Sequence, residues 1–122
     1  MNTLEKIIND KKESLEKIKK GKSLNILENN IKSQNFLDFK ETIQKNKGIS
    51  LISEIKKASP SAGILIKDFN HMDIAKMYVE NGATCLSVLT EEKYFLGKLE
   101  HIQDIKKKFK IPILAKDFFI DP

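Results

Sequence analysis

The chain has 122 residues, of which 40% are hydrophobic and 32% charged, with a formal net charge of +5. This composition is typical of one soluble domain with a real core and not of a disordered chain, and we expect neither a membrane span nor a secretory signal. All 22 basic residues are lysines interspersed with acidic residues, which favours solvated helix faces over a nucleic-acid surface but suits a small anionic substrate.

The N-terminal part predicts helices. An amphipathic helix is expected over residues 2–20, where apolar residues recur at the helical period: Leu4, Ile7, Ile8, Leu15 and Ile18. Asn2 and Glu5 have the spacing of a capping box, and Gly21 is a suitable stop. Residues 22–35 show little period.

A second helix is expected from about Asn35 to Lys45, with Phe36, Phe39 and Ile43 on one side. The pattern then alternates between short β-rich runs and helical periods. Strands are predicted over 49–55, 84–89 and 111–115, and helices over about 71–81 and 99–109. This order predicts an α/β fold with a parallel sheet, in which the loops after the strands are long and those after the helices short.

Glu54 and Lys56 are two residues apart at the end of the first predicted strand, so they point to the same face. Leu51 and Ile55 are assigned to the other face, beneath a covering helix. The pair can hold a substrate anion or act as acid and base, and it can equally be an ordinary ion pair at a strand end. Spacing alone leaves both interpretations open.

Lys116 ends the third predicted strand, where a lysine is placed to donate a proton. With 22 lysines in the chain a chance placement is easy, and the pattern alone favours a strand that simply reaches solvent at Lys116. Tyr94 and Phe95 lie in a loop rich in charged residues. Their rings can line a pocket for an aromatic substrate, or they can pack the loop against the rest of the protein. Ser87, inside the second predicted strand, can form a hydrogen bond either to a substrate or to a neighbouring residue.

The remaining polar residues give weaker signals. His71 and His101 are isolated in the sequence and lack metal-ligand spacing, so we expect surface positions. Cys85 lies among apolar residues and is expected in the core. As the only cysteine it has no internal disulfide partner, which favours a reducing, cytoplasmic location.

Three stretches together resemble indole-3-glycerol-phosphate synthases: SEIKKASPS at 53–61, LTEEKYF at 89–95 and IPILAKDF at 111–118. The first predicted helix also resembles the segment that precedes the barrel in this family. The resemblance implies an α/β fold, the N-terminal part of a (β/α)8 TIM barrel with an extra N-terminal helical segment. Residues 1–48 would form that helical extension, and residues 49–122 the first three strands and two helices of an incomplete barrel.

The resemblance also implies an activity. Family members close the indole ring of 1-(2-carboxyphenylamino)-1-deoxyribulose 5-phosphate, release carbon dioxide and water, and need no metal or organic cofactor. Lys116 matches the general acid, Lys56 a lysine that orients the substrate anions and assists proton transfer, and Glu54 the glutamate that positions both lysines. Five further positions match the pocket lining: Ser59, Pro60, Ser87, Phe95 and Phe118. Ala115 departs from the pattern, since many members carry a larger or basic residue there.

The chain ends at Pro122, after the third predicted strand, whereas the fold has eight strands in typically about 250 residues. The resemblance therefore predicts a chain that is inactive alone, without the second catalytic glutamate, the asparagine and the main phosphate-binding loops. The expected partners are the small phosphorylated substrate and either a second copy or the missing half of the barrel, with neither nucleic acid nor membrane. Two alternatives remain: a non-catalytic half-barrel that serves as an association module, and another phosphate-binding barrel enzyme such as phosphoribosylanthranilate isomerase. The Lys-Asp-Phe motif at Lys116 argues against the isomerase.

Overall fold

The computed structural model describes residues 1–31 and 36–122. The chain divides into two compact units, one formed by Met1–Asn35 with Phe118–Pro122 and the other by Phe36–Asp117. The predicted start of the second helix, Asn35, lies outside the described residues. Within the described ranges, no helix combines the length and the apolar character that a membrane span requires.

The first unit contains helices α1 (Thr3–Gly21) and α2 (Leu24–Asn29). The predicted capping box is present, because the Asn2 side chain accepts the Glu5 N–H while the Glu5 carboxylate accepts the Asn2 N–H. Helix α2 was not predicted, since a helix of six residues is too short to establish a period. An ion pair of 2.7 Å between Lys19 and Asp121 joins α1 to the last residues of the chain.

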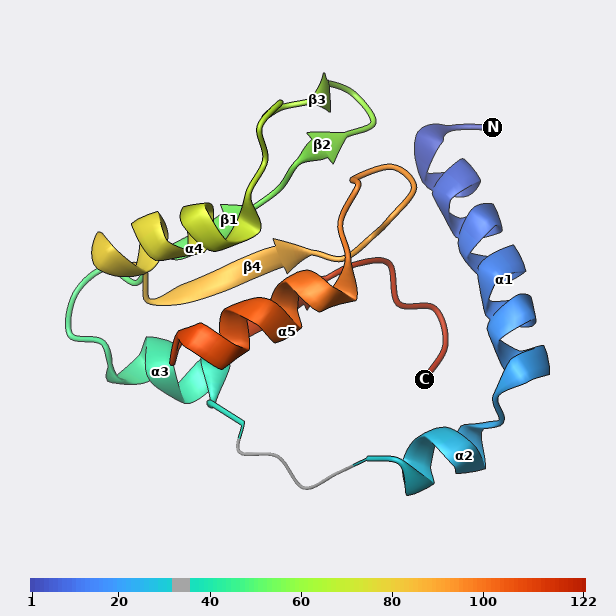
Figure 1. Cartoon of the computed structure of the whole chain (residues 1–122), viewed down its shortest axis with the longest axis horizontal. Helices are drawn as coiled ribbons and strands as arrows, with labels where there is room; N and C mark the ends of the chain where they lie inside the picture. The colour runs from blue at the N-terminus through green and yellow to red at the C-terminus, as the bar shows by residue number, and fades with distance from the viewer. Residues whose placement is uncertain (32–35) are drawn as a thin grey trace. The chain divides into compact units, whose positions relative to one another are not determined.

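The second unit is built on a parallel sheet. Its strands β1 (Ile52–Ile55), β4 (Cys85–Leu89) and β5 (Ile113–Lys116) lie in the order β1-β4-β5, and its helices are α3 (Phe39–Lys45), α4 (His71–Glu80) and α5 (Leu99–Lys108). The loop after β1 carries a small antiparallel hairpin of β2 (Ala58–Ser59) and β3 (Gly63–Ile64), which extends beyond the end of β1 in Figure 1. The alternation of strands and helices confirms the predicted α/β class with a parallel sheet.

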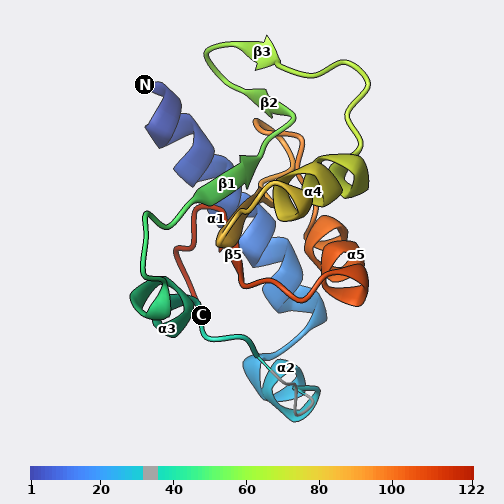
Figure 2. The same ribbon diagram turned by 90° about the vertical axis from the view of Figure 1, so that its left-hand side faces the viewer.

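Helices α4 and α5 lie side by side over one face of this sheet (Figure 2). Between helices and sheet lies the core, which consists of Ile55, Ala75, Leu86, Val88, Ile105 and Ile111. Burying an Ile, Leu or Val side chain is worth about 1.5–3 kcal/mol, so the five such residues of this layer hold the helices on the sheet. The core placement of Cys85 is confirmed, since it is fully buried.

Two details of the sequence interpretation were wrong. Leu51 is not covered by a helix but half exposed, because β1 begins one residue later and α4 packs over the part of the sheet that carries Ile55. Phe36 is not part of a helix, because α3 starts at Phe39, where the Asp38 side chain caps it by accepting the Glu41 N–H.

The opposite face of the sheet is open at its edges. Ile52 of β1 and Leu114 of β5 are 46% and 48% exposed, although both are apolar. By strand alternation they share this face with Glu54 and Lys116. This face, here called the open face, is therefore exposed along β1 and β5 but not along β4, where Cys85, Ser87 and Leu89 are buried. Its exposed parts are apolar toward the start of the strands and charged toward their carboxyl ends.

Candidate active site

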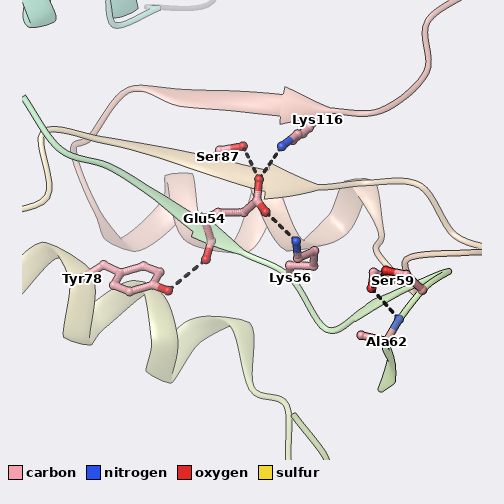
Figure 3. Close-up of polar contacts among 8 residues, drawn as sticks. Glu54, Lys56, Ser59, Ala62, Tyr78, Ser87 and Lys116 are labelled. Atoms are coloured by element: carbon pink, nitrogen blue, oxygen red, sulfur yellow. Dashed lines mark hydrogen bonds and ion pairs between the residues drawn. The ribbon is translucent and has the colours of Figure 1, made fainter. Parts of the chain in front are cut away.

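The carboxylate of Glu54 lies between two lysine side chains. Its Oε2 atom is 2.7 Å from Nζ of Lys116, and its Oε1 atom is 3.1 Å from Nζ of Lys56 (Figure 3). Glu54 lies in β1, Lys56 directly follows the last residue of β1, and Lys116 ends β5. The sequence predicted the first pair from its spacing. The register of the strands adds the second, because β4 places the carboxyl ends of β1 and β5 at the same edge of the sheet.

Glu54 is anchored from both its backbone and its side chain. The hydroxyl of Tyr78, on α4, donates a hydrogen bond of 2.9 Å to the Glu54 carbonyl oxygen. The Ser87 hydroxyl, on the neighbouring strand, is 3.5 Å from Oε2 of Glu54, which makes it a weak donor to the same carboxylate. Tyr78 had no signal in the sequence for this role.

These contacts control the ionisation of Glu54, whose side chain is 28% exposed. Burial by itself raises the pKa of the Glu54 carboxyl, but the hydrogen bonds from Lys116 and Lys56, together with the positive charges of these two lysines, outweigh burial. The net result is a pKa below the ordinary value of 4.5, so the carboxylate is charged at neutral pH. With two ammonium groups on one carboxylate, the cluster keeps an excess positive charge that can attract an anion.

We expect this cluster to stabilise the fold above about pH 4.5 and to lose that contribution in acid. The unfolded chain holds the Glu54 proton more tightly than the folded chain, so the contribution disappears as the pH falls through the folded pKa. The measurement is the free energy of unfolding in urea between roughly pH 3 and pH 7 for the wild type and Glu54→Gln.

The difference in unfolding free energy between wild type and Glu54→Gln should shrink below about pH 4.5. Glu41→Gln is the matched control, since the Glu41 side chain is 55% exposed and forms an ordinary surface pair with Lys45. A difference that is the same at all these pH values would contradict the assigned ionisation.

The predicted pocket-lining residues occupy different parts of the chain. Ser87 lies on β4 beside Glu54, and Phe95 is half-buried in the loop after β4. Ser59 and Pro60 lie in the hairpin after β1, where the Ser59 hydroxyl accepts the Ala62 N–H at 3.2 Å. Phe118 belongs to the other compact unit. The pocket-lining role of all five residues remains a prediction.

The loop after β4 is organised by Glu91, a residue that sequence analysis quoted only as part of a motif. Glu91 is 4% exposed, and its carboxylate accepts the backbone N–H groups of Lys93, Tyr94 and Phe95 at 3.1, 2.6 and 3.0 Å. The loop closes at Gly97, whose N–H donates to the Glu91 carbonyl at 2.8 Å. A Cβ at Gly97 would collide with the Leu89 carbonyl, so only glycine fits this close approach.

The start of the same loop is tied to the end of β5. The Thr90 N–H donates to the Lys116 carbonyl oxygen at 3.0 Å, and the Thr90 hydroxyl donates to Oδ2 of Asp117 at 2.9 Å. Thr90 is buried, so these bonds are shielded from water. They fix the backbone from which the Lys116 side chain projects.

His71 and His101 are far apart in the sequence but lie together in the structure, and both are partly buried. Their rings stack with centroids 4.2 Å apart, because α4 and α5 are neighbours on the sheet, and Nε2 of His71 lies 3.0 Å from Oδ2 of Asp104. Burial first, and then the proximity of His71, lowers the pKa of His101. Among the described residues no group of three or more His, Cys, Asp or Glu side chains is arranged to hold a metal ion.

Comparison with known proteins agrees with the motifs on this sheet. The family model for indole-3-glycerol phosphate synthase matches residues 4–122. The chain belongs to this family. It is 44% identical over 121 residues to the indole-3-glycerol phosphate synthase of Endomicrobium trichonymphae, an alignment that covers 97% of this chain and 46% of the relative.

Other relatives in the family give the same result. The synthase of Legionella pneumophila (strain Lens) is 43% identical over 118 residues, which cover 97% of this chain and 45% of the relative. That of Desulforamulus reducens is 49% identical over 85 residues, or 70% of this chain and 32% of the relative. The chain therefore spans less than half the length of these family members.

Proposed function

We propose that this chain supplies part of the active site of an indole-3-glycerol-phosphate synthase. The reaction closes the indole ring of 1-(2-carboxyphenylamino)-1-deoxyribulose 5-phosphate and releases carbon dioxide and water, a step of tryptophan biosynthesis. The observation that carries the proposal is the carboxylate of Glu54 held between Lys56 and Lys116. In barrels of parallel strands, active sites are built at the carboxyl ends of the strands, which is where this cluster lies.

Each charged group in the cluster has a chemical task in this proposal. Lys116 donates a proton to the substrate carbonyl oxygen as the aromatic ring carbon attacks the carbonyl carbon. Lys56 binds the anionic groups of the substrate and assists proton transfer. Glu54 orients both ammonium groups through the bonds of 2.7 and 3.1 Å.

The surrounding residues would form the walls of the pocket. Ser87 comes from β4 and Phe95 from the loop after it, Ser59 and Pro60 come from the loop after β1, and Phe118 follows β5. The reaction involves no net oxidation or reduction, so we propose no cofactor. A cytoplasmic location fits a chain whose single cysteine, Cys85, is buried and free.

The exposed apolar side chains on the open face of the sheet favour a partner that covers them. We propose that the strands which the relatives have beyond the span of this chain cover Ile52 and Leu114, and that a second copy covers them when those strands are absent. The isolated chain should then associate, with an average mass in sedimentation that rises with concentration. Leu114→Lys should weaken the association.

The control for this association is Leu99→Lys. Leu99 is also an exposed leucine, but it lies on α5, which packs on the opposite face of the sheet. If the chain remains monomeric at all concentrations, or if both substitutions have the same effect, the proposed pairing face is wrong.

The activity itself is tested on a joined protein, in which this chain is followed by the part of the Legionella pneumophila relative that it does not span. Incubation with 1-(2-carboxyphenylamino)-1-deoxyribulose 5-phosphate should yield carbon dioxide and an indole-fluorescent product in equal amounts. Phosphoribosylanthranilate in a parallel reaction tests the isomerase alternative. A folded joined protein that converts neither compound would leave the association module as the better interpretation.

A further inference from the structure

The structure assigns a positioning role to Glu91, namely ordering the loop after β4 so that Phe95 forms a fixed wall of the substrate pocket. This inference rests on the proposed function, because Phe95 lines a pocket only if the chain contributes to that active site. Glu91 itself would not touch the substrate. It would act through the three backbone N–H groups that its carboxylate accepts.

The Glu91 carboxylate is buried and fully hydrogen-bonded, unlike an ordinary carboxylate on a surface loop. A carboxylate that is 4% exposed is costly to bury unless its oxygens are hydrogen-bonded. Here both oxygens are used, since Oε1 accepts the Lys93 N–H and Oε2 accepts those of Tyr94 and Phe95. The bond to the Phe95 N–H fixes the backbone from which the aromatic ring projects, in a loop that has no strand or helix to order it.

The loop has a second anchor that does not involve the carboxylate. Thr90 bonds to the Lys116 carbonyl and to Asp117 through its own N–H and hydroxyl. Loss of the Glu91 carboxylate should therefore loosen the backbone of residues 93–95 while leaving the end of β5 in place. The consequence in a working enzyme is weaker substrate binding with little change in the chemical step.

The first test uses the 122-residue chain itself and the pair Glu91→Gln and Glu92→Gln. Both substitutions remove one carboxylate from neighbouring positions, but Glu92 is exposed, so it serves as the control. Glutamine keeps only one acceptor oxygen where Glu91 uses two. Amide hydrogen exchange at Lys93, Tyr94 and Phe95 should become at least about tenfold faster in Glu91→Gln and remain unchanged in the control.

Unchanged exchange in a folded Glu91→Gln chain would overturn the inference. If Glu91→Gln does not fold, Glu91→Asp retains the charge on a shorter side chain and should show a smaller acceleration at the same amides. A folded Glu91→Asp chain with wild-type exchange would also overturn the inference.

The second test measures kinetics in the joined protein. For Glu91→Gln we expect KM to rise by about tenfold and kcat to stay within about threefold of the wild type, with both constants unchanged in Glu92→Gln. An active joined protein in which KM does not move would overturn the positioning role alone. A folded joined protein without activity would overturn the proposed function and this role together, whereas the exchange measurement would still report whether Glu91 orders the loop.

Discussion

In the joined protein, Lys116→Met should reduce kcat by about 10² to 10⁴, the usual loss when a positioned general acid is removed. Methionine keeps the length of the side chain but has no proton to give. KM should change much less, because the proton is needed mainly in the transition state. Steady-state rates from indole fluorescence, with kcat and KM determined separately, measure this effect.

Lys110→Met is the matched control for this substitution. Lys110 is exposed and lies just before β5, at the opposite end of the strand from Lys116. It should leave both kinetic constants unchanged. If Lys116→Met kept most of its kcat, the assigned role would be wrong, and Lys56 would become the leading candidate for the acid.

The 122-residue chain alone should show no measurable synthase activity. It carries Glu54, Lys56 and Lys116, but its sheet is open at β1 and β5, and it spans less than half the length of its relatives. Substrate binding and the orientation of catalytic groups both contribute to rate, and a three-stranded sheet cannot enclose a pocket.

The assay for this second expectation compares the purified chain with the joined protein at equal concentration. Fluorescence of the indole product should rise only in the joined protein. Turnover by the chain alone within about tenfold of a full-length relative would contradict the expectation, because the open sheet would then be sufficient for catalysis.

The helices and strands with a periodic or β-rich residue pattern were predictable from the sequence. Apolar residues at the helical period located α1, α4 and α5, and short β-rich runs located the three strands of the parallel sheet. The alternation of side chains along a strand correctly placed Glu54 and Lys56 on one face. The hairpin of β2 and β3 was missed because strands of two residues carry no alternation.

The contacts between distant residues had no local signature. The bond from Lys116 to Glu54 spans 62 positions and follows from strand register, which sequence spacing does not reveal. Tyr78 bonds to a backbone carbonyl 24 positions away, a contact that depends on where α4 packs. The Glu91 bonds are local, but they depend on a loop conformation that no pattern of residue types revealed. His71 and His101 stack only because two helices are neighbours on the sheet.

If Glu54, Lys56 and Lys116 form part of a working synthase site, the joined protein should have a high kcat/KM for the substrate. We expect a value within about tenfold of the intact Legionella pneumophila relative, since the joined protein would contain every strand of the barrel. A folded joined protein that binds the substrate but has a kcat/KM lower by more than about 10⁴ would contradict it.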